Sequence, residues 1–251
     1  MLIICLDFNE CEKKTYNCHP LATCVNDPGS YSCKCKPGYV GNGHNCRHPT
    51  PRSCSEIRNY VSTVSRKYVI DPDGEEGLAP FTVYCDMTDK KGVGVTVISH
   101  DSESRKRVSG CESAGCYSRD IHYTGATLSQ LARLTTVSSH CEQSIKYECY
   151  GSGFWFNNPQ GWWVSRDSTK MTYWGGASPG SGKCACGMTN SCANTGDRCN
   201  CDKNDYNWRQ DSGLLTNKTK LPVKQLRFGD TGDKGEKGYH TLGKLKCYGT
   251  A

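Results

Sequence analysis

Residues 7–11 read DFNEC and residues 24–35 read CVNDPGSYSCKC, and these two stretches decide the fold of the first part of the chain. They belong to a run of six cysteines spaced C-x6-C-x5-C-x8-C-x-C-x10-C, namely Cys11, Cys18, Cys24, Cys33, Cys35 and Cys46. A segment this small cannot bury enough apolar surface to stay folded, so disulfide bonds must supply the missing stability. Spacing alone leaves about 15 possible pairings.

Cysteine content sets the expected compartment of the whole chain. Nineteen of the 251 residues are cysteine and only 35% of the residues are hydrophobic. Reducing compartments keep thiols free, so we expect a disulfide-stapled protein from an oxidising, extracellular environment. The alternative is a zinc protein, but CACGMTNSC and CNC at residues 184–201 lack the usual C-x₂₋₄-C hooks.

Charge and hydropathy exclude some partners. The net charge of +6 is scattered, and the densest basic run is Arg105–Arg107. That run is typical of a solvated loop, although an acidic glycan could also bind it. Nucleic acid is not an expected partner of an extracellular protein, and no apolar stretch is long enough for a transmembrane segment. The start MLIIC is too short for a signal peptide, so we expect that such a segment was removed or that the chain is a fragment.

The cysteine pattern, together with CKCKPGY at residues 33–39, resembles the EGF-like family over the whole segment. The resemblance implies a small disulfide-rich β module over residues 7–46, paired Cys11–Cys24, Cys18–Cys33 and Cys35–Cys46. DFNEC and CVNDPGSYSC resemble the calcium-binding subclass. Calcium takes six to eight hard oxygen ligands, and carboxylates and amides provide them.

The expected Ca²⁺ site combines side chains with main-chain carbonyls. Asp7 and Glu10 offer carboxylates and Asn26 offers an amide oxygen, while the resemblance adds the carbonyls of Phe8, Asp27 and Ser30. The alternative is that the acids are ordinary surface residues. The second half-motif also resembles the recognition pattern for hydroxylation of Asn26.

Residues 1–6 are expected to be the remnant of an upstream module of the same kind. C5-L-D7 resembles a junction in tandem EGF-like arrays, so Cys5 would have lost its partner by truncation. The rival interpretation is an intermolecular disulfide. In an array, calcium would stiffen the joint between modules.

After a linker at residues 47–53, the remaining residues 54–251 differ in pattern. Ser53 and Glu56 predict a capping box that begins a helix, and Ile57, Val61 and Val64 continue at helical spacing. Strands are expected at residues 67–70, 81–87 and 93–98, and a second helix at residues 126–134. This mixture favours an α+β domain.

Several stretches of this second part resemble fibrinogen-like domains. They include C54-SEIR, YVIDPDG and PFTVYC85-DMT; further along, KMTYWGGASPGSGKCACGMTNSC and CNCDKNDYNWRQDSGLLT resemble the contactin-associated, neurexin IV type. In that family the region sits in adhesive cell-surface proteins. A Cys54–Cys85 disulfide is a guess from this resemblance, and twelve cysteines here would make six bridges.

The second part has its own candidate sites. Asp202, Asn204, Asp205 and Asp211 could form a second Ca²⁺ loop, although their spacing departs from the fibrinogen pattern. Asp71 and Asp73 fit a plain Pro-Asp-Gly turn better than a calcium loop. Core packing is favoured over a ligand groove for the aromatic cluster Trp155, Trp162, Trp163, Tyr173 and Trp174.

Asn217-Lys-Thr219 is an acceptor for an N-linked glycan. The catalytic motif H-E-x-x-H does not occur in the sequence, and G-x-S-x-G occurs once, at Gly176–Gly180. That match lies in a glycine- and proline-rich stretch and not between a predicted strand and a predicted helix, the context that a catalytic serine of this motif needs. The leading hypothesis is therefore a non-enzymatic, extracellular, calcium-binding adhesion or matrix protein that engages a protein partner. The alternative is a calcium-dependent lectin with a glycan ligand, which chelator-sensitive sugar binding would identify.

Overall fold

The computed structural model describes residues 7–75 and 77–251. The chain divides into two compact units: the smaller contains the residues up to Thr50 and the short segment Gly74–Gly77, and the larger contains Pro51–Asp73 and Leu78–Ala251. The expected remnant of an upstream EGF-like module, residues 1–6 with Cys5, lies outside the described residues.

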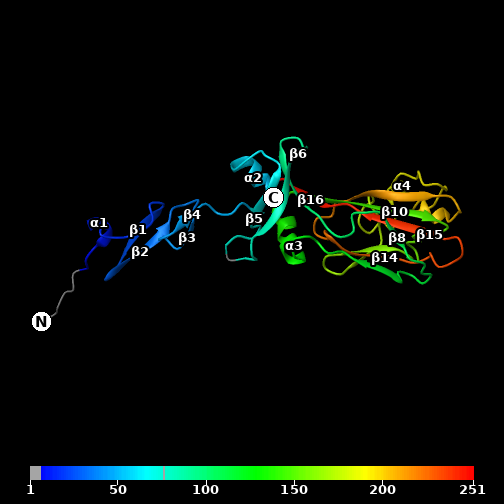
Figure 1. Ribbon diagram of the computed structural model, residues 1–251, viewed down its shortest axis with the longest axis horizontal. Coiled ribbons are helices and arrows are strands. Elements are labelled where there is room, and N and C mark those ends of the chain that lie inside the picture. Colours follow the sequence, from blue (N-terminus) through cyan, green and yellow to red (C-terminus); the bar gives the residue numbers. More distant parts are fainter. Residues whose placement is uncertain (1–6, 76) are drawn as a thin grey trace. The chain divides into compact units, whose positions relative to one another are not determined.

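The smaller unit is built on one hairpin (Figure 1). Strand β1 (Ala22–Asp27) pairs antiparallel with β2 (Ser30–Cys35), so that Asp27 faces Ser30 across the turn. Gly29 in this turn has φ +80, a conformation that glycine adopts without strain. The short helix α1 (Glu10–Lys13) precedes the hairpin, and β3 (Val40–Gly41) and β4 (Cys46–Arg47) follow it.

Three disulfides hold this unit together. The structure pairs Cys11 with Cys24, Cys18 with Cys33 and Cys35 with Cys46, which is the pairing that the resemblance implies. Cys46 is its only buried hydrophobic side chain among the described residues. The cross-links therefore replace a core.

The larger unit contains two antiparallel sheets. The first has the order β5-β6-β7-β16-β10-β15-β8, with β13 also paired to β10, and the second has the order β12-β11-β14-β9. The strands of the first sheet are β5 (Arg66–Ile70), β6 (Phe81–Lys90), β7 (Val93–Ile98), β8 (Lys106–Val108), β10 (His140–Tyr150), β13 (Arg209–Leu215), β15 (Lys237–Leu242) and β16 (Leu245–Tyr248). Those of the second are β9 (Tyr117–Asp120), β11 (Trp162–Ser165), β12 (Lys170–Met171) and β14 (Val223–Phe228).

The helices of the larger unit are short. They are α2 (Cys54–Tyr60), α3 (Leu128–Val137), α4 (Ala185–Met188) and the 3₁₀ turn η1 (Cys201–Lys203). The domain is thus mostly β-sheet, and the α+β prediction gave too much weight to two helical patterns. Sequence periodicity can identify a helix, but it does not give the share of the domain that is helical.

The helix starts follow capping chemistry. Ser53 accepts a hydrogen bond from the Glu56 amide, but the Glu56 carboxylate accepts from the Arg52 amide, so the predicted capping box is only half formed. Helix α2 also ends at Tyr60, and Val61 and Val64 are exposed, contrary to the predicted spacing. Helix α3 begins with a complete capping box made by Thr127 and Gln130.

The core lies between the two sheets, and aromatic rings fill much of it. Tyr147 on β10 stacks on Phe228 of β14 with ring centroids 4.5 Å apart. Trp163, Tyr173 and Trp174 are buried, which confirms the core prediction for three of the five clustered aromatics. Trp155 is partly exposed and Trp162 is half-buried, so the prediction was wrong for these two.

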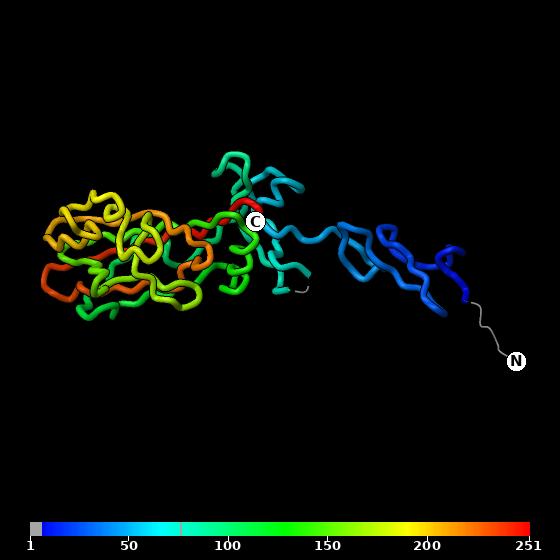
Figure 2. The backbone as a smooth tube through the Cα atoms, turned by 180° about the vertical axis from the view of Figure 1, so that it is seen from behind, coloured from blue at the N-terminus to red at the C-terminus, as the bar shows by residue number. Residues whose placement is uncertain are grey.

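Disulfides stabilise the part of the larger unit that has the fewest strands. Residues 172–208, yellow in Figure 2, run from β12 to β13 with only α4 and η1 as regular structure. Three of the six bridges begin or end there: Cys149–Cys201, Cys184–Cys199 and Cys186–Cys192. The others are Cys54–Cys85, Cys111–Cys116 and Cys141–Cys247. These cysteines are oxidised, so the zinc alternative has no thiolates to use.

Candidate functional site

The two half-motifs of the smaller unit meet at Asp7. One carboxylate oxygen of Asp7 accepts a hydrogen bond from the Asn26 side-chain amide at 2.7 Å, and the other accepts from the Gly29 amide at 2.6 Å. The bond from Asn26, followed by that from Gly29, lowers the pKa of Asp7. The residues before the first cysteine therefore lie against the hairpin turn.

Glu10 provides an independent sign of a missing partner. Its Oε2 atom is buried and has no hydrogen-bond partner among the described residues. A buried carboxylate oxygen without a donor is costly, and a cation would satisfy it. Glu10 is held in place because Asn9 caps α1 through a 3.0 Å bond to the Glu12 amide. The donor set of carboxylates, amide and carbonyls fits Ca²⁺, since all of its atoms are hard oxygens.

Phe8, Asp27 and Ser30 are the residues expected to bind the ion through their main-chain carbonyls. Asp27 and Ser30 are paired across the hairpin turn beside Gly29. The Phe8 side chain is 58% exposed, so the fold does not use it for packing.

The acidic residues of the second candidate loop already have other partners. Asp202 accepts hydrogen bonds from the Phe154 and Trp155 amides at 2.9 and 3.0 Å. Asp211 accepts from the Asn200 and Cys201 amides at 3.0 and 2.9 Å.

The two remaining members of this loop point to other roles. Asp205 forms an ion pair with Arg209 at 2.6 Å. Asn204 has a left-handed backbone, φ 45, and ends η1. The structure gives all three carboxylates of the loop a structural role, and the calcium assignment there stays a prediction.

Asp211, the most deeply buried acid of this loop, has a shifted pKa. Burial raises the pKa of Asp211 to about 6, although the amide hydrogen bonds oppose the shift. The buried Asp211 carboxylate links β13 to the start of η1 through these amide hydrogen bonds, so it is not accessible to an ion from solvent. Asp73, in the other candidate turn, accepts from the Leu78 amide at 3.1 Å and lies 3.4 Å from Arg133.

Sequence reasoning missed an exposed aromatic cluster on the larger unit. Tyr206 and Trp208 are 59% and 51% exposed. The Arg105 guanidinium lies 3.4 Å from the ring centroid of Tyr239 and 6.0 Å from that of Trp208. Arg105 also pairs with Glu148 at 2.9 Å, so the basic run is partly structural and is not only a solvated loop. The available signal was the pair of aromatics inside the polar run DYNWRQD.

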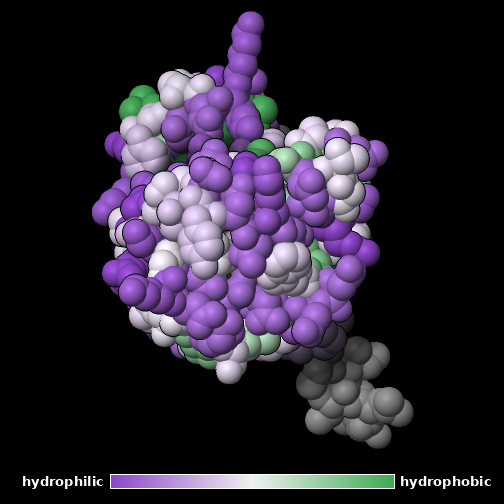
Figure 3. Space-filling model, turned by 90° about the vertical axis from the view of Figure 1, so that its right-hand side faces the viewer, coloured by the Kyte–Doolittle hydropathy of each residue, from purple (hydrophilic) through white to green (hydrophobic). Residues whose placement is uncertain are grey.

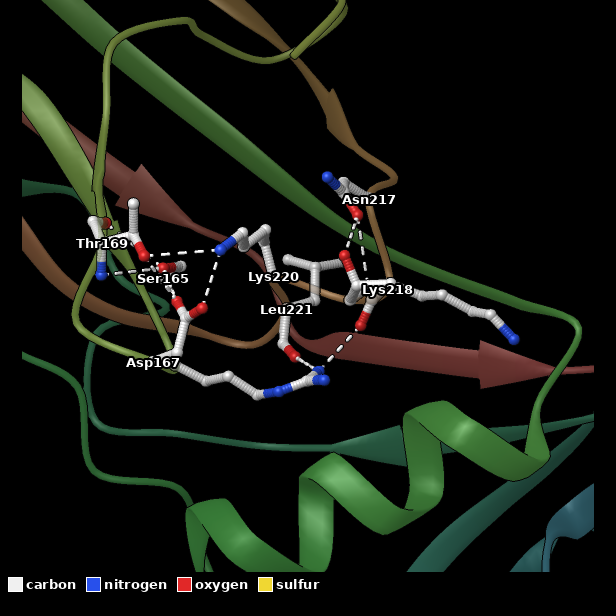
Figure 4. A network of polar contacts seen from close by, with 9 residues as sticks. Ser165, Asp167, Thr169, Asn217, Lys218, Lys220 and Leu221 are labelled. Atoms are coloured by element: carbon white, nitrogen blue, oxygen red, sulfur yellow. Dashed lines mark hydrogen bonds and ion pairs between the residues drawn. The ribbon is translucent and has the colours of Figure 1, made fainter. Parts of the chain in front are cut away.

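Asn217 lies at one end of a polar network (Figure 4). Its Oδ1 atom accepts from the Thr219 amide at 3.2 Å and from the Thr219 hydroxyl at 2.7 Å. Nearby, Lys220 pairs with Asp167 at 2.7 Å. Arg166 donates to Thr135 at 2.9 Å and to two main-chain carbonyls of the same loop. The acceptor asparagine is therefore presented on an ordered loop.

The surface at one end of the larger unit is mostly hydrophilic (Figure 3). Among the helices of the described residues, none is both long and apolar enough to cross a membrane.

Comparison with known proteins identifies both units. The EGF domain family matches residues 11–46, and the family described as fibrinogen beta and gamma chains, C-terminal globular domain, matches residues 50–109. Contactin-associated protein 1 of Rattus norvegicus and of Homo sapiens is 35% identical over 237 residues, which are 92% of this chain and 17% of the relative. Neurexin-4 of Drosophila melanogaster is 34% identical over 245 residues, 92% of this chain and 19% of the relative.

The chain is therefore an EGF-like domain followed by a fibrinogen-like domain. The pair is of the neurexin IV type, the type that contactin-associated protein 1 and neurexin-4 contain. The chain spans less than a fifth of the length of these relatives.

Proposed function

We propose that this chain is a non-enzymatic, extracellular adhesion module whose EGF-like domain binds Ca²⁺. Two observations support the proposal: Asp7 and Asn26 are in contact, and the buried Oε2 atom of Glu10 has no hydrogen-bond partner in the described part of the chain. The ion would be held by Asp7, Glu10 and Asn26 with the carbonyls of Phe8, Asp27 and Ser30. It would neutralise the carboxylates and fix the residues before Cys11 on the hairpin.

The fibrinogen-like domain would supply the protein-binding surface. The name contactin-associated protein 1 describes an association of that relative with contactin, and a cell-surface protein partner is the corresponding proposal here. The exposed Tyr206 and Trp208 beside Arg105 have the composition of interface anchors. A glycan ligand remains the alternative, and hydroxylation of Asn26 stays a prediction.

Glu10→Gln is expected to weaken calcium binding about tenfold, because it removes one charged ligand from the site. Calorimetric titration of Ca²⁺ into the wild-type chain and the variant measures the effect. Glu12→Gln is the matched control: it changes charge equally on the same short helix, and its affinity should stay within about twofold of the wild type.

Two results would contradict the calcium proposal. One is equal weakening by both glutamate variants, and the other is no binding to the wild-type chain at millimolar Ca²⁺. Asp7→Ala separates the two candidate sites. If calorimetry still detects one site in Asp7→Ala, the fibrinogen-like domain binds an ion of its own and Asp202 to Asp211 become its candidates.

Asn217 is expected to carry an N-linked glycan when the chain is secreted from eukaryotic cells. Removal of the glycan by peptide-N-glycosidase should lower the mass of the wild-type protein. Thr219→Ala should abolish this mass change, because the hydroxyl that bonds to Asn217 is lost. Thr216→Ala, on the other side of Asn217, should leave it unchanged. An unshifted wild-type mass would show that the site is not used.

A further inference from the structure

The outer face of the four-stranded sheet contains a hollow of about 450 Å³. Three basic side chains line it, Lys170 from β12 and Lys224 and Arg227 from β14, and the polar groups of Ser168 and Gln225 lie between them. None of the described acidic side chains lines the hollow. A concave surface of one charge concentrates ligands of the opposite charge.

Neutral groups orient two of these cations. The Lys224 ammonium donates to the Ser168 hydroxyl at 2.8 Å. The Arg227 guanidinium donates to Gln225 Oε1 at 2.6 Å and to the Gly115 carbonyl at 3.1 Å. Among the described residues, none of the three cations forms an ion pair, although twelve ion pairs occur elsewhere. Their charges are thus ordered but not neutralised.

The third cation is held by an aromatic ring. The Lys170 ammonium lies 3.6 Å from the ring centroid of Trp162, within the range of a cation–π interaction. Trp162 is itself fixed from another side by Gly115, where a Cβ atom would come within 2.1 Å of the ring. Asp120 on β9 faces Gln225 in the register and accepts a hydrogen bond from its side-chain amide.

Cation spacing decides what kind of anion fits. Val164 on β11 lies opposite Lys170 on one side and Gln225 of β14 on the other. Two strand spacings, about 10 Å, separate the backbones of Lys170 and Gln225, but the charged groups reach toward one another. The Lys170 ammonium lies over Trp162, which pairs with Arg227, and the Lys224 ammonium reaches Ser168 near β12. The three charges thus line one hollow, and a chain with repeated anionic groups can contact them together.

We propose that this hollow binds a sulfated glycan chain, independently of calcium. Arg227 matches a sulfate because the planar guanidinium donates two parallel hydrogen bonds to tetrahedral oxyanions. The Ser168 hydroxyl and the Gln225 amide can bond sugar hydroxyls. An acidic peptide fits less well, since sheets bind extended peptides at an edge and this hollow lies on a face.

The test uses a heparin dodecasaccharide in the presence of a chelator, so that calcium-dependent binding does not contribute. The double variant Lys170→Gln with Lys224→Gln should weaken binding about tenfold, because it removes two charged contacts. The matched control is Lys106→Gln with Arg107→Gln, which removes the same charge from the densest basic run; its affinity should fall less than about threefold. Raising the salt from physiological to high concentration should weaken wild-type binding further.

Several results would overturn the proposal. Equal weakening by both double variants would show that only net charge matters. Polyglutamate or a desulfated dodecasaccharide that binds as tightly as heparin would exclude sulfated-glycan recognition. Absence of binding by the wild-type chain at 0.15 M salt, or binding only without chelator, would exclude the site.

Discussion

Trp174→Ala is expected to lower the free energy of unfolding of the fibrinogen-like domain by about 3–5 kcal/mol. The Trp174 side chain is fully buried, and its ring centroid lies 4.6 Å from that of Phe154 and 5.9 Å from that of Phe228. Its indole also donates to the Asp211 carbonyl at 3.0 Å. The substitution would leave a cavity and an unsatisfied buried carbonyl, which both destabilise the core.

Denaturant unfolding followed by fluorescence or circular dichroism measures this loss. Trp208→Ala is the control, because it removes the same side chain from a position that is 51% exposed. We expect a loss of less than about 1 kcal/mol for the control. Equal losses of unfolding free energy for the two variants would contradict the placement of Trp174 in a buried core between the sheets.

His240 is expected to make the same domain less stable at acidic pH. It is fully buried, and burial, with smaller effects from Arg119 and Lys106, lowers its pKa to about 4. The Tyr117 hydroxyl lies 3.0 Å from one ring nitrogen, and the other nitrogen is buried without a partner in the described part of the chain. The fold thus accepts the neutral imidazole and disfavours the charged one.

The pKa of the folded state lies below the value near 6.5 of an unfolded histidine. The stabilisation is therefore complete above pH 6.5 and is lost as the pH falls from 6.5 toward 4. The loss is about 3 kcal/mol. Asp211 has the opposite effect, because its raised pKa makes the folded state bind a proton more readily as the pH falls through 6.

Comparison of the wild type with His240→Gln isolates the histidine. The difference in unfolding free energy between the two proteins should change by about 3 kcal/mol between pH 7.5 and pH 4. His140→Gln is the control, since His140 is an exposed histidine of the same domain that stacks on Tyr248 and forms no ion pair among the described residues. The difference in unfolding free energy between His140→Gln and the wild type should depend little on pH. A pH-independent difference for His240→Gln would mean that the buried ring is accommodated in its charged form.

The sequence was sufficient for features that depend on local chemistry. The strands at residues 67–70, 81–87 and 93–98 and the helix that contains residues 128–134 appear in the structure, because their hydrophobic periods coincide with burial. Both domain types were also recognisable, and the comparisons confirm them. The spacing of the first six cysteines was informative because it resembles the EGF-like family, and that resemblance implied the pairing that the structure contains.

The remaining features depend on contacts between distant residues. Nothing near His240 in the sequence indicates that Tyr117 and Arg119 approach it from another strand. Asp211 looked like a surface ligand because its neighbours are polar, yet the fold buries it under η1. The basic hollow joins β12 and β14, which are more than fifty residues apart, so no local motif could predict it.

The position of β16 affects the order in which the two domains can form during synthesis. Residues 245–248 occupy the middle of the large sheet, between β7 and β10, and the Cys141–Cys247 bridge spans 106 residues. In the EGF-like domain, each disulfide closes within 15 residues. The ribosome therefore releases a segment that can fold and oxidise at once. The fibrinogen-like domain must wait until residue 248 has left the exit tunnel. Until then residues 95–98 of β7 and 140–142 of β10 lack the strand that pairs with them and expose edges that are open to wrong pairing.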